Sequence, residues 1–114
     1  MATLTSFDPG LLDTRTVHKL LSASIAPRPI AFASTVDAKG NVNLSPFSFF
    51  NVFSSNPPIL IFSPARRVRD NTTKHTLQNA AETKEVVINS VDFSIVEQMS
   101  ASSKDYAKGV NEFI

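Results

Sequence analysis

The segment from residue 41 to residue 58, NVNLSPFSFFNVFSSNPP, constrains the fold of this 114-residue chain more than any other. It places phenylalanines among short hydroxyl and amide side chains, with Pro46 near its start. Aromatic and β-branched residues favour extended chain, whereas a proline cannot donate to a sheet ladder and so interrupts it. We therefore expect a strand that begins at Val42 and leaves the ladder near Ser45.

Beyond Ser45, flat apolar rings would lie beside free backbone groups and short polar side chains. A planar heteroaromatic ligand needs such a surface, because its faces are apolar and its edge requires a few donors and acceptors. The same composition also suits a phenylalanine-rich core strand with solvated serines. Taken alone, the segment leaves both interpretations open.

The residues before this segment predict a hairpin. Residues 30–37 read as a strand with small side chains on one face. Gly40 in the following turn can take a positive φ, which favours antiparallel pairing with the next strand. This pairing would bring Ser34 and Thr35 close to Asn43 and Ser45.

Breakers and periodic apolar residues predict the remaining elements. The short apolar run at 59–62 lies between prolines and indicates a strand buried on both faces. Helix capping and apolar spacing predict three helices and one further strand. These are a helix capped by Asp13 or Thr14, a helix after residue 74 with apolar positions Leu77, Ala80 and Ala81, a strand at 86–91 and a helix capped by Asp92 or Ser94.

A basic stretch, residues 66–74, leads into the helix after residue 74. A solvated charged loop is the plain interpretation of such a stretch. However, free N–H groups, the positive end of the helix dipole, hydroxyls and cations together make a phosphate site. Taken alone, the stretch leaves both interpretations open.

Composition excludes several classes of function. A net charge of +1 gives no field for capturing nucleic acid or an anionic membrane. The chain has no cysteine and only two histidines, which argues against disulfides and zinc. No P-loop, dinucleotide fingerprint or nucleophile elbow is present. Because no signal peptide or membrane span is apparent either, we expect a soluble, cytoplasmic protein.

Four blocks of sequence, in order, resemble the flavin reductase-like family, whose domain is the FMN-binding split barrel. They are APRPIAFAST (26–35), SPFSFFN (45–51), NPPILIFS (56–63) and KHTLQNAAETKEVVIN (74–89), with His75 where the family usually has aspartate. The resemblance implies a mainly β fold with short helices, an antiparallel split β-barrel. Family members are about twice as long, so we expect one domain over residues 1–114, incomplete on its C-terminal side.

The resemblance also implies a function. FMN, or alternatively FAD, would receive hydride from NAD(P)H and pass electrons to a flavin, a metal ion, oxygen or a partner oxygenase. The flavin would lie near a homodimer interface, and no catalytic side chain is expected because the cofactor carries the chemistry. A non-catalytic flavin carrier and a flavin-free fragment completed by another chain are the alternatives. The cofactor-binding residues that the resemblance implies are Ser34, Thr35, Ser45, Phe47, Ser48, Phe49, Asn51, Ser63, Arg66, Lys74 and Thr76, of which the last three would hold the phosphate.

Overall fold

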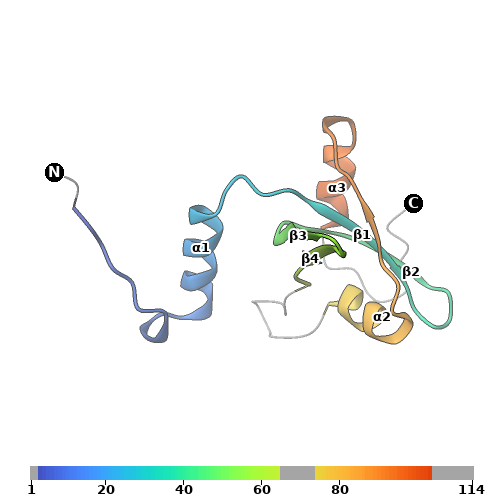
Figure 1. The fold of residues 1–114 in the computed structure, drawn as a ribbon, viewed down its shortest axis with the longest axis horizontal. Coiled ribbons are helices and arrows are strands. Elements are labelled where there is room, and N and C mark those ends of the chain that lie inside the picture. Colours follow the sequence, from blue (N-terminus) through green and yellow to red (C-terminus); the bar gives the residue numbers. More distant parts are fainter. Residues whose placement is uncertain (1–2, 65–73, 104–114) are drawn as a thin grey trace.

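The computed structural model describes residues 3–64 and 74–103. Short helices flank five strands in these residues (Figure 1). In chain order the elements are a 3-10 helix (Pro9–Leu11), α1 (Thr14–Ser24), β1 (Ala31–Val36), β2 (Val42–Phe47), β3 (Phe50–Ser55), β4 (Pro58–Phe62), α2 (His75–Thr83), β5 (Val87–Asn89), a second 3-10 helix (Phe93–Ile95) and α3 (Val96–Ser102).

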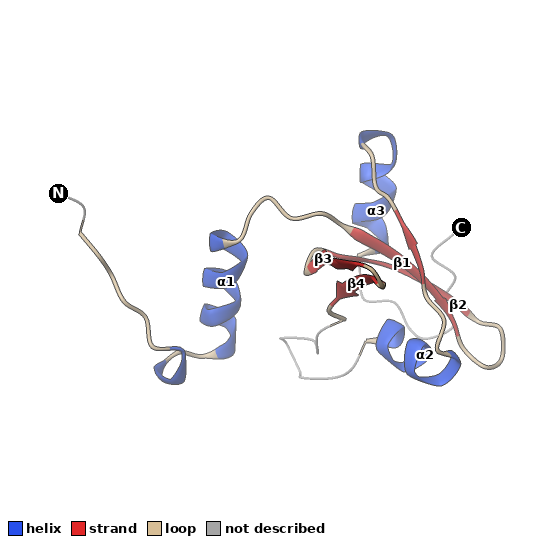
Figure 2. Cartoon of the chain, viewed as in Figure 1, coloured by secondary structure: helices blue, strands red, loops and turns tan. Residues whose placement is uncertain are grey.

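The strands form a three-stranded sheet, ordered β2-β1-β5, and a separate two-stranded sheet, β3-β4. All pairings are antiparallel. The predicted hairpin is confirmed, since Val36 pairs with Val42 and Gly40 has a φ of 85° in the turn. Within the described residues the two sheets do not close into a barrel (Figure 2).

The expectation that β2 leaves the ladder near Ser45 is wrong. Pro46 pairs with Phe32, and the ladder continues to the pair of Ala31 and Phe47. The sheet order explains this, because β2 is an edge strand with one side free of a neighbouring strand. A proline is tolerated at such an edge, where its missing N–H need not remove a ladder bond.

The chain after Pro46 is more regular than its sequence predicts. Phe50 pairs with Phe62 and Ser55 with Pro58, so the asparagine and prolines at 56–58 shape a hairpin turn between β3 and β4. The register shifts between Val52 and Ser54, which marks a bulge or irregularity. The sequence did not predict β3, because its polar and aromatic residues do not alternate in a simple pattern.

Two helical segments begin at capping residues that the sequence predicts. The side chain of Asp13 accepts a hydrogen bond from the Thr16 N–H at 2.7 Å and caps α1. Asp92 does the same for Ser94 at 2.9 Å, at the 3-10 helix that leads into α3. α2 lies against β1 and β2, and α3 lies against β2 (Figure 1). None of the described helices is long and apolar enough to cross a membrane.

The core of the described chain is small. Its centre is formed by Ala31, Ala33 and Phe47, and Phe50, Phe62, Val86 and Ile88 pack against it. The radius of gyration is 16.3 Å, against about 13 Å for a compact domain of this size. Figure 1 shows why, since α1 lies to one side of the two sheets and the segment before it extends away from them.

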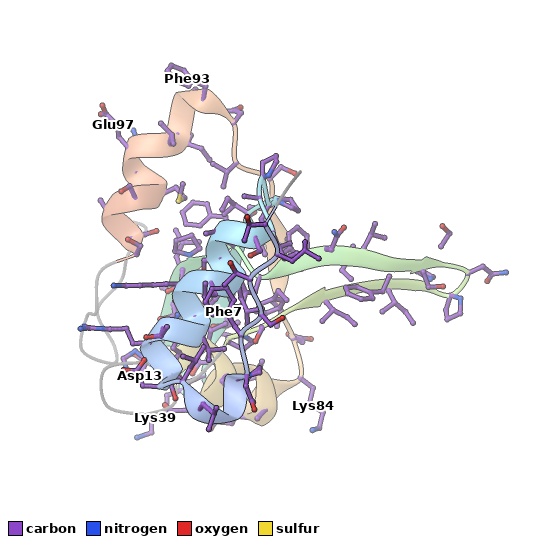
Figure 3. All side chains as sticks on the ribbon, turned by 90° about the vertical axis from the view of Figure 1, so that its left-hand side faces the viewer. Phe7, Asp13, Lys39, Lys84, Phe93 and Glu97 are labelled. Atoms are coloured by element: carbon purple, nitrogen blue, oxygen red, sulfur yellow. The ribbon has the colours of Figure 1, made fainter. Side chains whose placement is uncertain are left out.

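Many large apolar side chains remain exposed. Ile59, Leu60 and Ile61 of β4 are 41–53% exposed, so the expectation that β4 is buried on both faces is wrong for the described chain. No described element covers the β3–β4 hairpin sufficiently to bury them. Phe93, 92% exposed, points outward beside α3 in Figure 3. Apolar surface on this scale is typical of an interface.

Candidate functional site

An apolar cavity of about 420 Å³ lies between α1 and the β3–β4 hairpin. One wall is formed by Leu21 and Ile25 with the segment 27–29, and the other by residues 49–51, Phe53 and Ile61. Its volume falls within the range of small-molecule sites, about 300–1,000 Å³. The wall contains two residues that the sequence predicts for a flavin ring, Phe49 and Asn51.

Phe49 connects α1 to the rest of the molecule. Its ring centroid lies 5.6 Å from that of His18 on α1, and the Arg28 guanidinium lies 5.4 Å from the same centroid. Arg28 also donates from Nη1 to the carbonyls of Ser22, at 2.7 Å, and Ile25. The end of α1 is thus fixed through a half-buried cation that stacks on one phenylalanine.

Phe47 connects the aromatic residues to the start of α2. Its ring packs 5.4 Å from that of Phe62, and the Lys74 ammonium lies 5.0 Å from its centroid. Lys74 is the residue before α2 and has extended dihedral angles. The start of α2 therefore brings together a cation, the first N–H groups of a helix and the aromatic core.

A buried polar cluster lies between α2 and the β1–β2 hairpin. Asn43 donates from Nδ2 to the Thr76 hydroxyl at 2.9 Å, and Asn79 donates from Nδ2 to the Thr35 hydroxyl at 3.1 Å. α2 therefore directs Thr76 and Asn79 toward the sheet, while Leu77, expected on its apolar face, is 38% exposed.

Sequence analysis missed Asn43 and Asn79 as members of this cluster. The signal was present in the pattern: positions 76 and 79 share one helix face, and positions 35 and 43 are opposite each other across the predicted hairpin. The buried face of α2 was predicted from its apolar residues alone, and this prediction overlooked the polar residues that face the sheet.

The other predicted site residues lie in separate places. Ser34 and Thr35 line a second hollow of about 270 Å³ beside Val86 and Val87, away from the Phe49 cavity. Ser45 and Ser48 are half-buried. Ser63 is exposed, and its N–H donates to the Phe49 carbonyl at 2.9 Å. Arg66 lies outside the described residues.

Ionisable chemistry is sparse around the cavity. The described residues contain no group of three or more histidine, cysteine, aspartate or glutamate side chains placed to hold a metal ion. Hydrogen bonds from Thr16 lower the pKa of Asp13, and hydrogen bonds from Ser94 lower that of Asp92, but both carboxylates are exposed helix caps. The cavity thus offers surfaces for binding rather than an acid–base pair.

Antiparallel sheets with short helices define a mainly β class of protein. The family model described as "Flavin reductase like domain" matches residues 23–114, which is most of the chain. The protein belongs to the flavin reductase-like family.

Individual relatives agree with this assignment. An uncharacterized protein of Aquifex aeolicus is 42% identical over 101 residues, covering 89% of this chain and 51% of the relative. Nitrilotriacetate monooxygenase component B from Bacillus cereus superposes with a TM-score of 0.90 at 31% identity, covering 99% of this chain and 55% of that one. A putative flavin reductase with a split barrel domain from Shewanella frigidimarina gives a TM-score of 0.71 at 33% identity, covering 96% and 54%. The chain thus spans about half the length of these relatives.

Proposed function

We propose that the protein acts as an FMN-dependent NAD(P)H reductase, with FAD as the alternative flavin. The observation that carries this proposal is the contact of Lys74 with Phe47, which joins a cation at a helix start to the aromatic residues. A flavin mononucleotide combines matching parts, a flat ring system at one end and a phosphate at the other. Family membership supports a flavin as the ligand.

The residues present fit such a ligand. Phe49 and Phe50 offer apolar rings in the wall of the 420 Å³ cavity. The Asn51 Oδ1 accepts from the Val52 N–H at 2.8 Å, which leaves its Nδ2 to donate to a polar ring edge. Six further residues remain proposed neighbours of the ring or of the residues that support it: Ser34, Thr35, Ser45, Phe47, Ser48 and Ser63.

The phosphate end would be held at the start of α2. Lys74 would supply charge, and N–H groups at the helix start would supply directed donors. The Thr76 side chain is 1% exposed and engaged by Asn43, so its contribution would come through its backbone N–H. We propose that Arg66 adds a second cation.

Bound flavin would supply the redox chemistry, accepting a hydride from a reduced nicotinamide and passing electrons onward. The role of the protein would be to orient the ring, exclude water from one face and leave the other face accessible. Phe49, Phe50 and the α1 side of the cavity are placed to exclude water. No side chain of this chain would act as a nucleophile.

The proposal extends to partners and location. The exposed apolar residues of the β3–β4 hairpin support a homodimer with the flavin near its interface. One structural relative is the B component of a monooxygenase, which supports a partner oxygenase as the acceptor; free flavin, a metal ion or oxygen are the other candidates. We place the protein in the cytoplasm, with neither nucleic acid nor membrane as a partner.

Anaerobic stopped-flow mixing of the FMN-loaded protein with NADH, and separately with NADPH, tests the activity. The expected result is a loss of visible flavin absorbance far faster than that of free FMN, with one nicotinamide preferred. The Asn51→Leu variant should be reduced more slowly. The Phe93→Ala variant, changed at an exposed position just before α3, should be reduced at the unmodified rate. Reduction of bound FMN no faster than that of free FMN would indicate a non-catalytic flavin carrier instead.

A further inference from the structure

The buried polar cluster between α2 and the β1–β2 hairpin consists of Thr35, Asn43, Thr76 and Asn79, which are all between 1% and 6% exposed. Its two hydrogen bonds are reciprocal. A sheet amide, that of Asn43, donates to a helix hydroxyl, and a helix amide, that of Asn79, donates to a sheet hydroxyl. The helix is therefore fixed to the sheet at two points.

The backbone geometry places these four side chains together. Thr35 and Asn43 are direct partners in the β1–β2 ladder, so they share one face of the sheet. Thr76 and Asn79 lie three residues apart on α2 and share one face of the helix. A one-residue slip of either element would separate both pairs.

Such a contact fixes position more strictly than an apolar one. Hydrogen bonds are directional, and each buried amide or hydroxyl that loses its partner carries the full cost of its desolvation. Apolar side chains would tolerate a small rotation of α2, and Leu77, the large apolar residue of this helix, is 38% exposed. Asn79 Oδ1 even remains buried without a partner among the described residues. A contact that retains an unsatisfied oxygen is better explained by orientation than by stability.

The element that this contact orients carries Lys74, two residues before Thr76, with its ammonium 5.0 Å from the Phe47 centroid. We infer that Thr35, Asn43, Thr76 and Asn79 are positioning residues, which set the start of α2 and Lys74 against the aromatic residues and so determine the affinity for a ligand phosphate. This inference rests on the proposed flavin function. It assigns Thr35 a supporting role rather than direct contact with the ring.

Substitutions that remove one hydroxyl while keeping the side-chain shape test the inference. Thr35→Val removes the acceptor for Asn79, whereas Thr35→Ser retains it. Thr83→Val is a matched control on the same helix, because among residues 3–64 and 74–103 the Thr83 hydroxyl donates to the backbone carbonyl of Asn79 within α2 and not to the sheet. Two readouts are needed: the affinities for FMN and for riboflavin, which lacks the phosphate, and hydrogen exchange of the α2 amides.

For Thr35→Val we expect FMN binding to weaken about fivefold to tenfold, as loss of one buried hydrogen bond implies. Riboflavin binding should change less than twofold, and the α2 amides should exchange faster. Thr35→Ser and Thr83→Val should resemble the unmodified protein in both readouts. A merely structural role would weaken both ligands equally.

Three outcomes would contradict parts of this account in different ways. Equal losses for FMN and riboflavin, or none, would overturn the positioning role while leaving flavin binding intact. Unchanged α2 exchange in Thr35→Val would overturn the anchoring itself, whatever the protein binds. If the unmodified protein binds no FMN, the proposed function fails, and the positioning of a flavin phosphate fails with it.

Discussion

The ammonium of Lys74 lies 5.0 Å from the centre of the Phe47 ring, at the residue that precedes α2. Phe47 belongs to the buried core of the three-stranded sheet, so this lysine lies at the border between the core and the helix start. A cation held against an aromatic face retains its charge for a second interaction. The contact therefore places a positive charge at the start of α2.

Replacing Lys74 with methionine keeps most of the side-chain length and removes the charge. We expect the affinity for FMN to fall about tenfold to a hundredfold, since a charge-assisted hydrogen bond contributes roughly 1.5–3 kcal/mol. Riboflavin should bind almost as before. Isothermal titration with both ligands measures this, and Lys19→Met on exposed α1 is the control for net charge. Equal losses for both ligands would place the phosphate elsewhere.

Phe49 should hold α1 in place. Its ring contacts both His18 and Arg28, so Phe49→Ala removes an aromatic contact and a cation–π contact together. We expect a loss of about 1–2 kcal/mol of stability, with faster hydrogen exchange in α1 than in β1 or β2. Phe93→Ala, at a residue 92% exposed, is the matched control and should leave α1 unchanged. Unaltered α1 protection in Phe49→Ala would show that other contacts hold the helix.

Low pH should loosen the start of α1. Hydrogen bonds from Thr16 lower the pKa of Asp13 below its ordinary value of 3.8. A carboxylate whose pKa is lowered on folding stabilises the folded state above its unfolded-state pKa, and this stabilisation disappears as the pH falls through the folded-state pKa. Amide chemical shifts of residues 14–17 should therefore report fraying below about pH 4.

Asp13→Asn separates the charge from the hydrogen bond, because asparagine also caps helices well but does not titrate. In this variant the first turn of α1 should keep the same order from neutral pH down to acid pH. If the asparagine variant frays over the same pH range as the unmodified protein, Asp13 is not the group responsible.

Sequence patterns predicted the start of α1 and the β1–β2 turn correctly, for a physical reason. Asp13 and Gly40 act locally, through a cap and a turn, so their consequences do not depend on distant residues. Pro46 was misjudged because its tolerance depends on β2 being an edge strand, which is a property of the whole sheet. The exposure of β4 likewise depends on which layers cover it, and no local pattern encodes that.

The candidate site shows the same limit. Phe49 and Asn51 were predicted from the family resemblance, and both line one cavity. Ser34 and Thr35 do not join them, because the β1–β2 hairpin carries them to another hollow. Asn79 shares a helix face with Thr76, but its role becomes apparent only once the Thr35 hydroxyl is placed opposite it.

The chain should associate with itself in solution. Val52 and Phe53 of β3 and the three central residues of β4 expose apolar side chains on the same hairpin, and unpaired strand edges offer a second route to pairing. Size-exclusion chromatography with light scattering should show a dimer or larger species at micromolar concentration. Phe53→Lys should shift this equilibrium toward monomer, whereas Phe93→Lys should shift it less. A monodisperse monomer that melts cooperatively would contradict the prediction.

The visible spectrum of the protein, recorded after incubation with FMN and removal of unbound ligand by gel filtration, tests the central claim of flavin binding most directly. We predict that yellow flavin absorbance elutes with the associated protein and that the melting temperature rises relative to the untreated sample. The Lys74→Met variant should lose most of this absorbance under the same conditions. A colourless protein fraction with an unchanged melting temperature would contradict the account.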